Sequence, residues 1–565
     1  MLTTFGTNTY LATLIVGKAG STMLDVATLY ARLNDAKTCV LPRILDQQAA
    51  ERPEKTCIIF ENGPSWTYAE TQRHARGTAA ALSALGIAKG TRVLVMLDNG
   101  PEVVRVSLGL YYLGAIIMPI NTELPVPLLQ RTIDYGEAEL LIAGCEYLKL
   151  LTQCSFAHLE RVVVVGRELS AHPIKEAGVE FLGEDVLSAE SPMPTDCDPV
   201  IEPWETHTVF FTSGTTGVSK GVECSHIHTA TMAIDGLRYL NAEDIFLAPF
   251  AYYHIAGAYV PWSVFHAGAT MVVVRRFSAS RFWQQVRNYD VTAALLLGVM
   301  CDFLLNQPET ERDAENPLRF IVQQPLIGSV HTFRRRFGVE VYTQYDKTET
   351  SPPITSDLVR DGDDIVAGYC GRIRSGFEAR IVDANDRDVP VGEVGELIVR
   401  CDVPWVIASR YFNMPEETVR AWQNGWHHTG DLFRRDGEGR FYFVDRSKDV
   451  IRRRGESISS FEIERELAEH PRIAAGAAYA VPCPEFEGES EVMVAVEPED
   501  GTTIDPEEVV NFLTRRVARH MLPRYIRVLP TLSRNTTNKI VKTALVCEAI
   551  TEDTWERPLS RETVQ

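Results

Sequence analysis

The chain has 565 residues, 45% of them apolar, and a formal net charge of −20 at pH 7. The length predicts two or more domains, each with a core of its own. The acidic balance argues against nucleic acid or an anionic membrane surface as the main partner. The 11 cysteines are scattered and form no C-x-x-C pair, which is typical of reduced thiols in a cytoplasm.

Residues 1–37 are interpreted as an N-terminal extension outside the folded domains. Its apolar stretch "YLATLIVG" (Tyr10–Gly17) is short and follows no basic residue, which argues against a signal peptide. Whether the true start is Met1 or Met23 stays open. No apolar run approaches the ~18 residues that span a bilayer, so we expect no stable membrane insertion.

Apolar, β-rich runs alternate with helical patterns over the next part of the chain. Four of them indicate buried strands, at residues 91–97, 114–121, 139–144 and 161–166. A helix is expected from Tyr68 to near Gly86 or Gly90. Four further runs each indicate a strand followed by a helix, at 206–214, 244–250, 270–277 and 292–299. This alternation predicts α/β architecture with parallel-rich sheets and flanking helices.

The pattern changes after Gly376. Residues 377–400 alternate at period two around polar turns, which predicts a small antiparallel β unit. Beyond Lys448, helical patterns at 460–470 and 506–521 and a strand at 491–498 predict a compact α+β domain. We therefore expect a large domain over 38–447 and a small mobile C-terminal domain over 448–565.

The stretch "FFTSGTTGVSKG" (Phe210–Gly221) predicts a phosphate-binding loop. Glycines let successive backbone N–H groups converge on an anion, hydroxyls add donors, and Lys220 adds a positive charge. Its spacing differs from G-x-x-x-x-G-K-[ST], so it is not the P-loop of nucleotide triphosphatases. A flexible surface loop is the alternative.

Three further motifs follow in order: "YTQYDKTETS" (Tyr342–Ser351), the run from Gly425 to Glu456 that includes "HTGDL", and "SRNTTNKIVKTAL" (Ser533–Leu545). With the loop, they resemble the signature series of the adenylate-forming superfamily, over about residues 41–545. That superfamily contains acyl-CoA synthetases, peptide-synthetase adenylation domains and luciferase. The spellings "VSKG", "IRRRGE" and "TTNK" are most similar to acyl-CoA ligases of the crotonobetaine/carnitine type.

The resemblance implies a two-step reaction that uses ATP, Mg²⁺ and coenzyme A. A carboxylic acid and ATP give an acyl adenylate and pyrophosphate, and the thiol of coenzyme A then displaces AMP. The loop would hold the β- and γ-phosphates through Thr212, Ser213, Gly214, Thr215, Thr216, Gly217 and Lys220. Thr212 and Glu349, the latter beside Thr348, match the positions that contact Mg²⁺, which prefers oxygen ligands.

The resemblance also implies roles for the remaining nucleotide contacts. Asp431 would accept hydrogen bonds from both ribose hydroxyls, with Arg446 as a second ribose contact. Tyr345 would stack on adenine, although such a tyrosine is more often core packing. Lys539 would bridge the substrate carboxylate and the α-phosphate and stabilise the transition state.

In this family the small domain rotates between the two half-reactions. Lys448 matches the hinge position. Gly455 and Glu456 fall where the second face forms a pantetheine tunnel, and Arg453, with its neighbouring arginines, would meet phosphates of coenzyme A. A solvated strand edge is the alternative reading of these arginines.

The resemblance also implies an acyl pocket lined by Tyr252, Tyr253, His254, Val299, Gly328 and Asp346. His254 matches a gate beside the reacting groups, or it is a structural histidine.

The chain departs from the family pattern at several positions. Asp346 stands where the family has a small residue, and Gln323–Pro325 replaces Gly-Gly-Ala beside adenine. Ser219 and Asn538 replace Pro and Gly. Asp346 with the aromatic faces of Tyr252, Tyr253 and Trp262 would suit a cationic acid such as carnitine or a betaine. Alternatively Asp346 pairs with Lys347 or Arg372, and the substrate is a plain aliphatic, aryl or polycyclic acid.

Two other functions stay open at this point. An adenylating enzyme could pass its acyl group to an amine or a carrier-protein thiol, and product analysis would separate that from coenzyme A ligation. A non-catalytic adenylate-binding protein would be expected to lack Lys539, Glu349 or Asp431, and all three are present. We expect a cytoplasmic enzyme with small-molecule partners and no nucleic acid, and a homodimer is allowed for.

Overall fold

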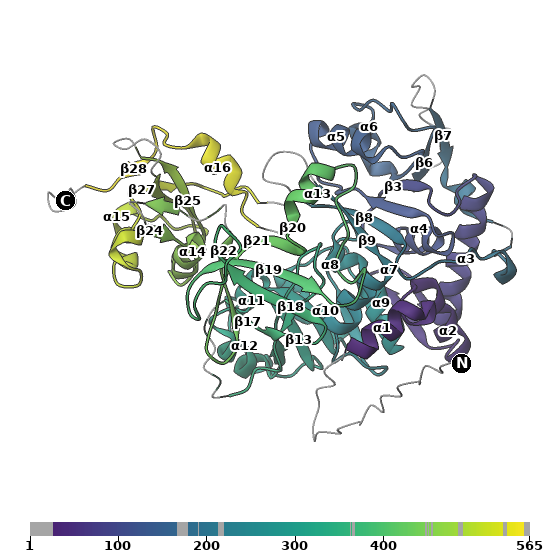
Figure 1. Ribbon diagram of the computed structural model, residues 1–565, viewed down its shortest axis with the longest axis horizontal. Coiled ribbons are helices and arrows are strands. Elements are labelled where there is room, and N and C mark those ends of the chain that lie inside the picture. Colours follow the sequence, from purple (N-terminus) through teal and green to yellow (C-terminus); the bar gives the residue numbers. More distant parts are fainter. Residues whose placement is uncertain are drawn as a thin grey trace, which may run out of the picture.

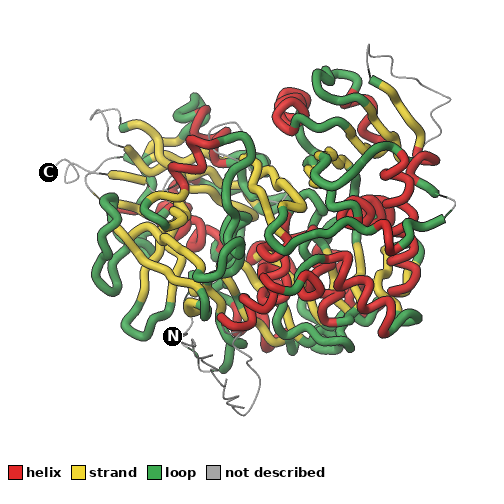
Figure 2. Tube along the Cα trace, turned by 45° about the vertical axis from the view of Figure 1, so that its right-hand side comes forward, coloured by secondary structure: helices red, strands yellow, loops and turns green. Residues whose placement is uncertain are grey.

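The computed structural model describes residues 26–166, 179–189, 191–212, 220–361, 363, 366, 368–446, 449, 451–453, 456–483, 490–534 and 539–558. Figure 1 shows a large part that carries the N-terminal helices and a smaller part, yellow-green to yellow, near the end of the chain. Figure 2 shows helices packed beside the strands of the large part. No helix within these ranges is both long and apolar enough to cross a membrane.

One sheet of the large part has seven strands, parallel except for an antiparallel edge pair. In spatial order the strands are β14 (Glu340–Tyr342), β13 (Phe320–Gln324), β12 (Ala293–Leu297), β10 (Ile245–Ala248), β11 (Thr270–Val273), β1 (Thr56–Phe60) and β2 (Ser65–Thr67). Helices that connect or follow them include α8 (Ile255–Ala258), α9 (Val260–Ala267), α10 (Ala279–Asn288), α11 (Gly298–Leu305) and α12 (Val330–Phe337). The strand–helix units predicted at 244–250, 270–277 and 292–299 are confirmed.

The second seven-stranded sheet contains the four buried strands that the sequence predicts. Its order is β7 (Glu180–Gly183), β6 (Arg161–Val165), β5 (Leu140–Gly144), β3 (Arg92–Met96), β4 (Ile116–Pro119), β8 (Thr206–Thr212) and β9 (Lys220–Ser225). It is flanked by α3 (Tyr68–Ala84), α4 (Pro101–Tyr112), α5 (Val126–Gly136) and α6 (Leu148–Leu151). Helix α3 begins at a Thr67–Glu70 capping box and ends before Gly86, which has a φ of 83°.

The helix expected directly after residues 206–214 is wrong. The chain returns as strand β9, antiparallel to β8, with Thr212 opposite Lys220. Its side chains Val222 and Cys224 are fully buried, so this segment gains more from strand pairing and burial than from a helix. Helix α7 (His226–Ala230) begins only where the Ser225 side chain accepts from His228 N.

The predicted antiparallel unit after Gly376 is confirmed, and it is larger than expected. Its path runs through β15 (Gln344–Tyr345), β16 (Ile354–Thr355), β17 (Tyr369–Ile373), β22 (Phe441–Arg446), β21 (Trp426–Arg435), β19 (Gly395–Cys401) and β18 (Phe377–Val382), with β20 (Trp422–Gln423) paired to β21. Helix α13 (Pro415–Ala421) lies between β19 and β20 in the chain. Through β15 this sheet reaches the "YTQYDKTETS" motif.

The small part has a mixed sheet and a core of its own. The sheet order is β25 (Ile473–Pro482), β26 (Ser490–Pro498), β27 (Tyr525–Val528) and β28 (Trp555–Glu556), with β26 and β27 parallel. Around it lie the hairpin β23 (Ile451–Arg453) and β24 (Glu456–Ile458), and α14 (Ser460–Ala468), α15 (Pro506–Leu513) and α16 (Lys542–Glu548). The helix predicted over 506–521 is shorter, since a separate 3-10 turn covers Arg519–Met521.

The first described helices belong to the large part. Helix α1 (Val26–Asn34) precedes a 3-10 turn (Ala36–Thr38) and α2 (Leu41–Glu51). Leu29 is fully buried, and Arg32 lies 2.7 Å from Asp235, which also contacts Arg374. The segment predicted to be an extension therefore ends in a helix that packs into the core.

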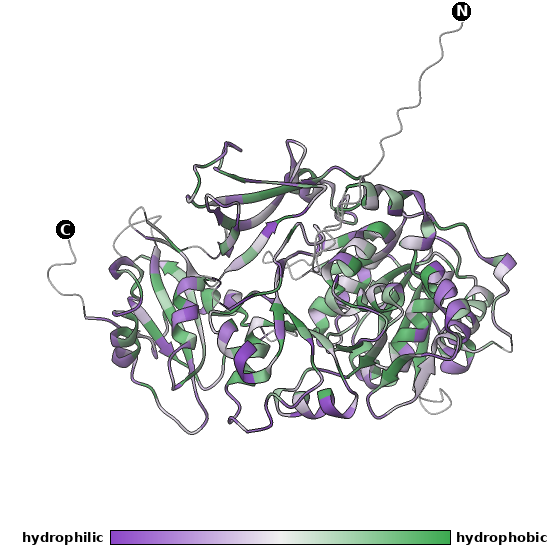
Figure 3. Ribbon diagram, turned by 90° about the horizontal axis from the view of Figure 1, so that it is seen from below, coloured by the Kyte–Doolittle hydropathy of each residue, from purple (hydrophilic) through white to green (hydrophobic). Residues whose placement is uncertain are grey.

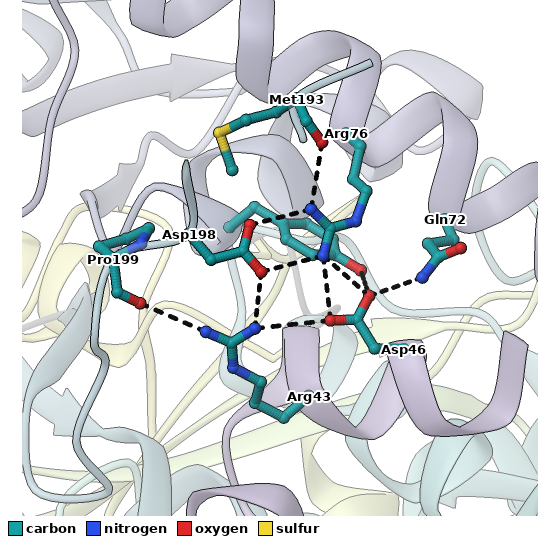
Figure 4. A network of polar contacts seen from close by, with 8 residues as sticks. Arg43, Asp46, Gln72, Arg76, Met193, Asp198 and Pro199 are labelled. Atoms are coloured by element: carbon teal, nitrogen blue, oxygen red, sulfur yellow. Dashed lines mark hydrogen bonds and ion pairs between the residues drawn. The ribbon is translucent and has the colours of Figure 1, made fainter. Parts of the chain in front are cut away.

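A buried ionic network fastens α2 and α3 to the segment before β8 (Figure 4). Arg76 Nη1 lies 2.9 Å from Asp198 and its Nη2 lies 3.1 Å from Asp46, while Arg43 lies 2.7 Å from Asp198. The side chains of Arg76 and Asp198 are both buried, so removing Arg76 should cost about 3–5 kcal/mol, because Asp198 loses its buried partner. Figure 3 shows hydrophobic residues along the interior strands and hydrophilic ones on many outward helical turns.

Candidate active site

The predicted phosphate loop joins the paired ends of β8 and β9. The Thr212 hydroxyl donates to the backbone carbonyl of Lys220 at 3.2 Å, so both ends of the loop are held together. The residues between them that we expect to contact phosphate lie outside the described residues: Ser213, Gly214, Thr215, Thr216 and Gly217. Their roles stay predictions.

Lys220 is held by two groups that the sequence analysis did not single out. Its Nζ lies 2.6 Å from Oε2 of Glu417, on α13. The same ammonium lies 4.8 Å from the centre of the Tyr411 ring, a distance typical of a cation–π contact. Tyr411 reaches this position through a β-bridge to Val222. No sequence pattern pointed to it, because only the tertiary fold brings the two segments together.

The Glu349 carboxylate is 6% exposed and is connected to Lys220 through the same tyrosine. The Tyr411 hydroxyl donates to Oε1 of Glu349 at 2.9 Å. Burial alone would raise the pKa of Glu349, but the charge of Lys347 and this hydrogen bond outweigh it and hold the pKa below its ordinary value. The ionised Glu349 carboxylate and the Thr212 hydroxyl are both hard oxygen donors, the type of ligand that suits Mg²⁺.

The backbone next to Glu349 is fixed by a buried histidine. Nε2 of His228 lies 3.0 Å from the carbonyl oxygen of Thr348. The amide of Ala408 donates to the carbonyl of Glu349 at 2.8 Å. The imidazole of His427, 2% exposed, has no hydrogen-bond partner for either nitrogen among the described residues, and burial lowers its pKa to about 3. It is therefore a neutral ring near Glu349.

Three residues expected at the nucleoside lie together at the end of the antiparallel sheet. Asp431 on β21 is paired in register with Arg446 on β22, and its Oδ1 lies 3.8 Å from Nε of Arg446. The Tyr345 hydroxyl donates to Oδ2 of Asp431 at 2.6 Å. The Tyr345 ring meets Phe433 edge-on at 4.8 Å. These contacts bring the expected ribose and adenine groups to one place.

Asp346 forms no ion pair with Lys347 or Arg372, the two basic residues proposed as its alternative partners, so the predicted pairing is wrong. Lys347 donates to the carbonyl of Thr429, and Arg372 to that of Glu438. Instead, Oδ2 of Asp346 accepts from Nε2 of Gln324 at 3.1 Å and from Nε2 of Gln344 at 3.0 Å.

Two departures from the family pattern, Gln324 and Asp346, are thus bonded to each other. Asp346 is half-buried, and the surrounding protein raises its pKa. A carboxyl group with two amide donors on one oxygen lies beside the expected nucleotide site.

Lys539 brings a cation from the small part to this site. Lys539 is exposed to solvent as a residue. The protein around its ammonium group nevertheless desolvates that group and lowers its pKa. Arg446 lowers this pKa further, whereas the carboxylates of Asp431 and Asp346 oppose the shift. Lys539 also acts on His254, whose pKa burial lowers to about 4. The expected transition-state lysine therefore lies within electrostatic range of the expected ribose acid.

The residues expected at the acyl pocket are only partly brought together. Tyr252 and Tyr253 line a small cavity beside β3, β4 and β8, whose other walls include Val95, Leu97, Tyr111, Ile117, Phe210 and Ala258. His254, Val299, Gly328 and Asp346 are not part of its lining. Val299 is half-buried on α11 and Gly328 is exposed.

Trp262, proposed as an aromatic face for a cationic substrate, cannot serve that role in this structure. It is fully buried, and its indole nitrogen donates to the carbonyl of Cys39 at 2.9 Å. Its ring packs against Tyr111 and His207 at 5.3 and 4.9 Å. The aromatic contribution is therefore confined to Tyr252 and Tyr253.

The expected coenzyme A and hinge residues are described only in part. Lys448 and Gly455 lie outside the described residues, and Glu456 begins β24. Arg453 is 5% exposed, lies 2.7 Å from Glu491, and donates to the carbonyls of His520 and Leu522. Its guanidinium faces the interior of the small part, and its contact with coenzyme A stays a prediction.

Comparison with known proteins gives matches over most of the chain. The AMP-binding enzyme family matches residues 45–411, and the AMP-binding enzyme C-terminal domain matches residues 462–539. A crotonobetaine/carnitine–CoA ligase of Salmonella typhi is 30% identical over 517 residues, which cover 89% of this chain and 98% of the relative. The corresponding ligase of Escherichia fergusonii is 31% identical over 518 residues, with the same coverage.

Solved structures share the fold at lower sequence identity. The anthranilate CoA ligase AuaEII with anthranoyl-AMP has a TM-score of 0.77 at 23% identity, covering 89% of this chain and 96% of that one. ATP-bound MatB from Rhodopseudomonas palustris has a TM-score of 0.76 at 23% identity, covering 90% and 98%. The predicted two-part α/β architecture is thereby confirmed.

Proposed function

The chain belongs to the AMP-binding enzyme family and is an AMP-forming acyl-CoA synthetase, and we propose that it joins a carboxylic acid to coenzyme A through an acyl adenylate. The observation that carries the proposal is the meeting of Tyr345, Asp431 and Arg446 at one place, with the charge of Asp431 also reaching Lys539 of the small part. The Lys539 cation, the Asp431 carboxylate expected at the ribose and the ionised Glu349 would act together in forming the acyl adenylate.

In the first step, a carboxylate oxygen of the acid attacks the α-phosphorus of ATP. The bond from the α-phosphorus to the bridging oxygen breaks, and pyrophosphate leaves with that oxygen. Lys539 stabilises the negative charge that gathers on the α-phosphoryl oxygens. Lys220 binds the phosphates that become pyrophosphate, and Asp431 with Arg446 orients the ribose. Glu349 and Thr212 would hold Mg²⁺, whose charge would neutralise that of the phosphates.

In the second step, the sulfur of coenzyme A attacks the acyl carbon and AMP leaves with the carboxyl oxygen. The thiol proton is released to solvent. We propose that the small domain turns about Lys448 to present Gly455, Glu456 and Arg453 for this step. In this structure the Arg453 guanidinium contacts Glu491, so it must leave that carboxylate to reach a phosphate of coenzyme A.

For the acid we propose a cationic carboxylic acid, on two grounds. Asp346 is a carboxyl group with no basic side chain bonded to it among the described residues, and it lies beside the nucleotide site. The relatives that match this chain include crotonobetaine/carnitine–CoA ligases, one of which is 30% identical with 98% of its length covered. A neutral aliphatic, aryl or polycyclic acid is the competing class.

A release assay tests this function directly. The full-length enzyme is incubated with Mg-ATP and a panel of carnitine, betaines, fatty acids and aryl acids, and pyrophosphate is measured for each. Mass spectrometry after addition of coenzyme A, a carrier-protein thiol or an amine then identifies the acceptor. Acid-dependent pyrophosphate with acyl-CoA supports the proposal. An amide or carrier-bound product would show that the acceptor is an amine or a carrier-protein thiol instead of coenzyme A. A lack of acid-dependent pyrophosphate release would favour a non-catalytic adenylate-binding protein.

A further inference from the structure

The ion pair between Lys220 and Glu417 places a carboxylate where a phosphate is expected to bind. The two side chains are 2.6 Å apart and remain 28% and 31% exposed, so solvent and a ligand can reach the pair. The hydrogen bond from Lys220 lowers the pKa of Glu417, which is therefore charged at neutral pH. Lys220 therefore has an anionic partner within the protein itself.

The position of Glu417 relative to Lys220 is set by the backbone around Tyr411. The amide of Phe412 donates to the carbonyl of Gly221 at 2.7 Å, which holds this segment against β9. The amide of Tyr411 donates to the Thr418 hydroxyl at 3.0 Å, which ties α13 to the same segment. These contacts hold the segment that carries Glu417, so its carboxylate is positioned next to Lys220 by the backbone.

Glu417 has a second cation that would remain when Lys220 leaves. Its Oε1 lies 2.5 Å from Nη1 of Arg420, one turn later on α13, while its Oε2 contacts Lys220. When a phosphate chain binds the Lys220 ammonium, the Glu417 carboxylate would therefore still be paired with Arg420. Oε1 of Glu417 thus contacts Arg420 on the same helix, whereas Oε2 contacts Lys220.

We propose that Glu417 is the resting counter-ion of Lys220, competing with the ATP phosphates for its ammonium and recapturing it as pyrophosphate leaves. This inference rests on the proposed function. Glu417 is a positioning residue, because it acts through Lys220. Because Glu417 competes for the Lys220 ammonium, it raises the concentration of ATP needed for half-saturation and shortens the residence time of pyrophosphate.

The size of the effect follows from the exposure of the pair. Exposed ion pairs contribute modestly, so removing the competitor should tighten binding of the phosphate chain by about two- to fivefold. Salt screens such pairs, and the gain should shrink at high ionic strength.

The test compares Glu417→Gln, Glu417→Asp and the wild type, with Glu416→Gln on the same helix as the matched control. Calorimetry measures binding of Mg-pyrophosphate and of ATP to the full-length protein without acid or coenzyme A. KM for ATP and kcat are measured with an acid from the release assay. We expect Glu417→Gln to bind both ligands about two- to fivefold more tightly and to lower KM. Glu417→Asp should lie closer to the wild type, and Glu416→Gln should match it.

Equal or weaker binding by Glu417→Gln, with a wild-type melting temperature, would overturn the inference while leaving the proposed function intact. If the wild type binds neither ATP nor pyrophosphate, and releases no pyrophosphate with any acid, both the inference and the proposed function are wrong. A gain that persists unchanged in about 0.5 M salt would also contradict a competing charge as its cause.

Discussion

The hydroxyl of Tyr345 donates a 2.6 Å hydrogen bond to Oδ2 of Asp431, across the end of the antiparallel sheet. Asp431 is 6% exposed, so this bond satisfies a carboxylate oxygen that water hardly reaches. A carboxylate has enough lone pairs to keep this donor and still accept from ribose. The tyrosine therefore prepares Asp431 for the nucleotide in addition to offering its ring.

Tyr345→Phe keeps the ring and removes the donor. We expect a loss of about 1–3 kcal/mol in the free energy of unfolding, because a buried acceptor loses its partner. KM for ATP should change by less than about threefold, because the ribose hydroxyls replace the lost donor. Asp431→Asn, in contrast, should raise KM more than about tenfold. Urea denaturation and steady-state kinetics measure the two effects, and a Tyr345→Phe variant of unchanged stability would contradict this assignment.

Lys539→Ala should separate the two half-reactions. Pyrophosphate release from acid and ATP should fall about 10²–10³-fold, because a positioned charge at the α-phosphate is lost. Turnover of a preformed acyl adenylate with coenzyme A should stay near the wild-type rate, which makes it the internal control. A comparable loss in both assays would show that Lys539 acts on the fold or on both steps.

Lys448→Pro tests the expected hinge. A hydrogen bond joins the segments on either side of it, since Asp445 on β22 accepts from the amide of Ser460 at 2.6 Å. Proline fixes φ and removes an amide, and should hinder rotation at this point. Single-turnover assays should show a selective loss of thioester formation with adenylation largely kept, while Lys448→Ala behaves as wild type. Normal rates for both steps in the proline variant would move the hinge elsewhere.

Asp302 on α11 predicts a pH dependence of the domain arrangement. Burial, and then the charge of Glu469 at the end of α14, raise its pKa from 3.8 to about 7. Because the pKa is raised, ionisation opposes this arrangement: the penalty begins above 3.8 and is complete above about 7. Acid should therefore favour the arrangement in Figure 1.

Asp302→Asn should remove that dependence. We expect the adenylation rate of the variant, measured as pyrophosphate release between about pH 5 and pH 8, to fall less with rising pH than that of the wild type. Glu309→Gln, an exposed acid in the same part of the chain, is the control. If the two pH profiles coincide, the Asp302 carboxyl does not face the small part in solution.

The alternation of apolar runs was enough to predict the strands at Leu94 and Val163, because a strand buried on both faces must be apolar throughout. It could not predict strand β9, whose antiparallel return depends on pairing with β8. Residue types and order, read through the family resemblance, pointed to Glu349 and Lys539. The contacts that connect the site, such as Tyr411 with Glu349, join residues 62 apart in sequence and have no local signal.

Asp346 provides the sharpest test of substrate choice. Its Oδ2 is bonded by Gln324 and Gln344, and no basic side chain forms an ion pair with it among the described residues. A cationic acid would supply an ion-pair partner, and a half-buried carboxylate gains from such a partner. Asp346→Gly should therefore lower kcat/KM for carnitine about tenfold or more, with little loss for a medium-chain fatty acid or an aryl acid.

Asp346→Asn and Gln324→Ala refine the cause of that change. Asp346→Asn keeps the volume and removes the charge, so it should match Asp346→Gly if charge decides. Gln324→Ala removes one of the two amide donors and should have a smaller effect in the same direction. The charge of Asp346 also acts on Lys539, and a loss through that lysine would lower kcat/KM equally for every acid. A wild type that ignores carnitine, or an equal loss across the panel, would remove Asp346 from substrate recognition.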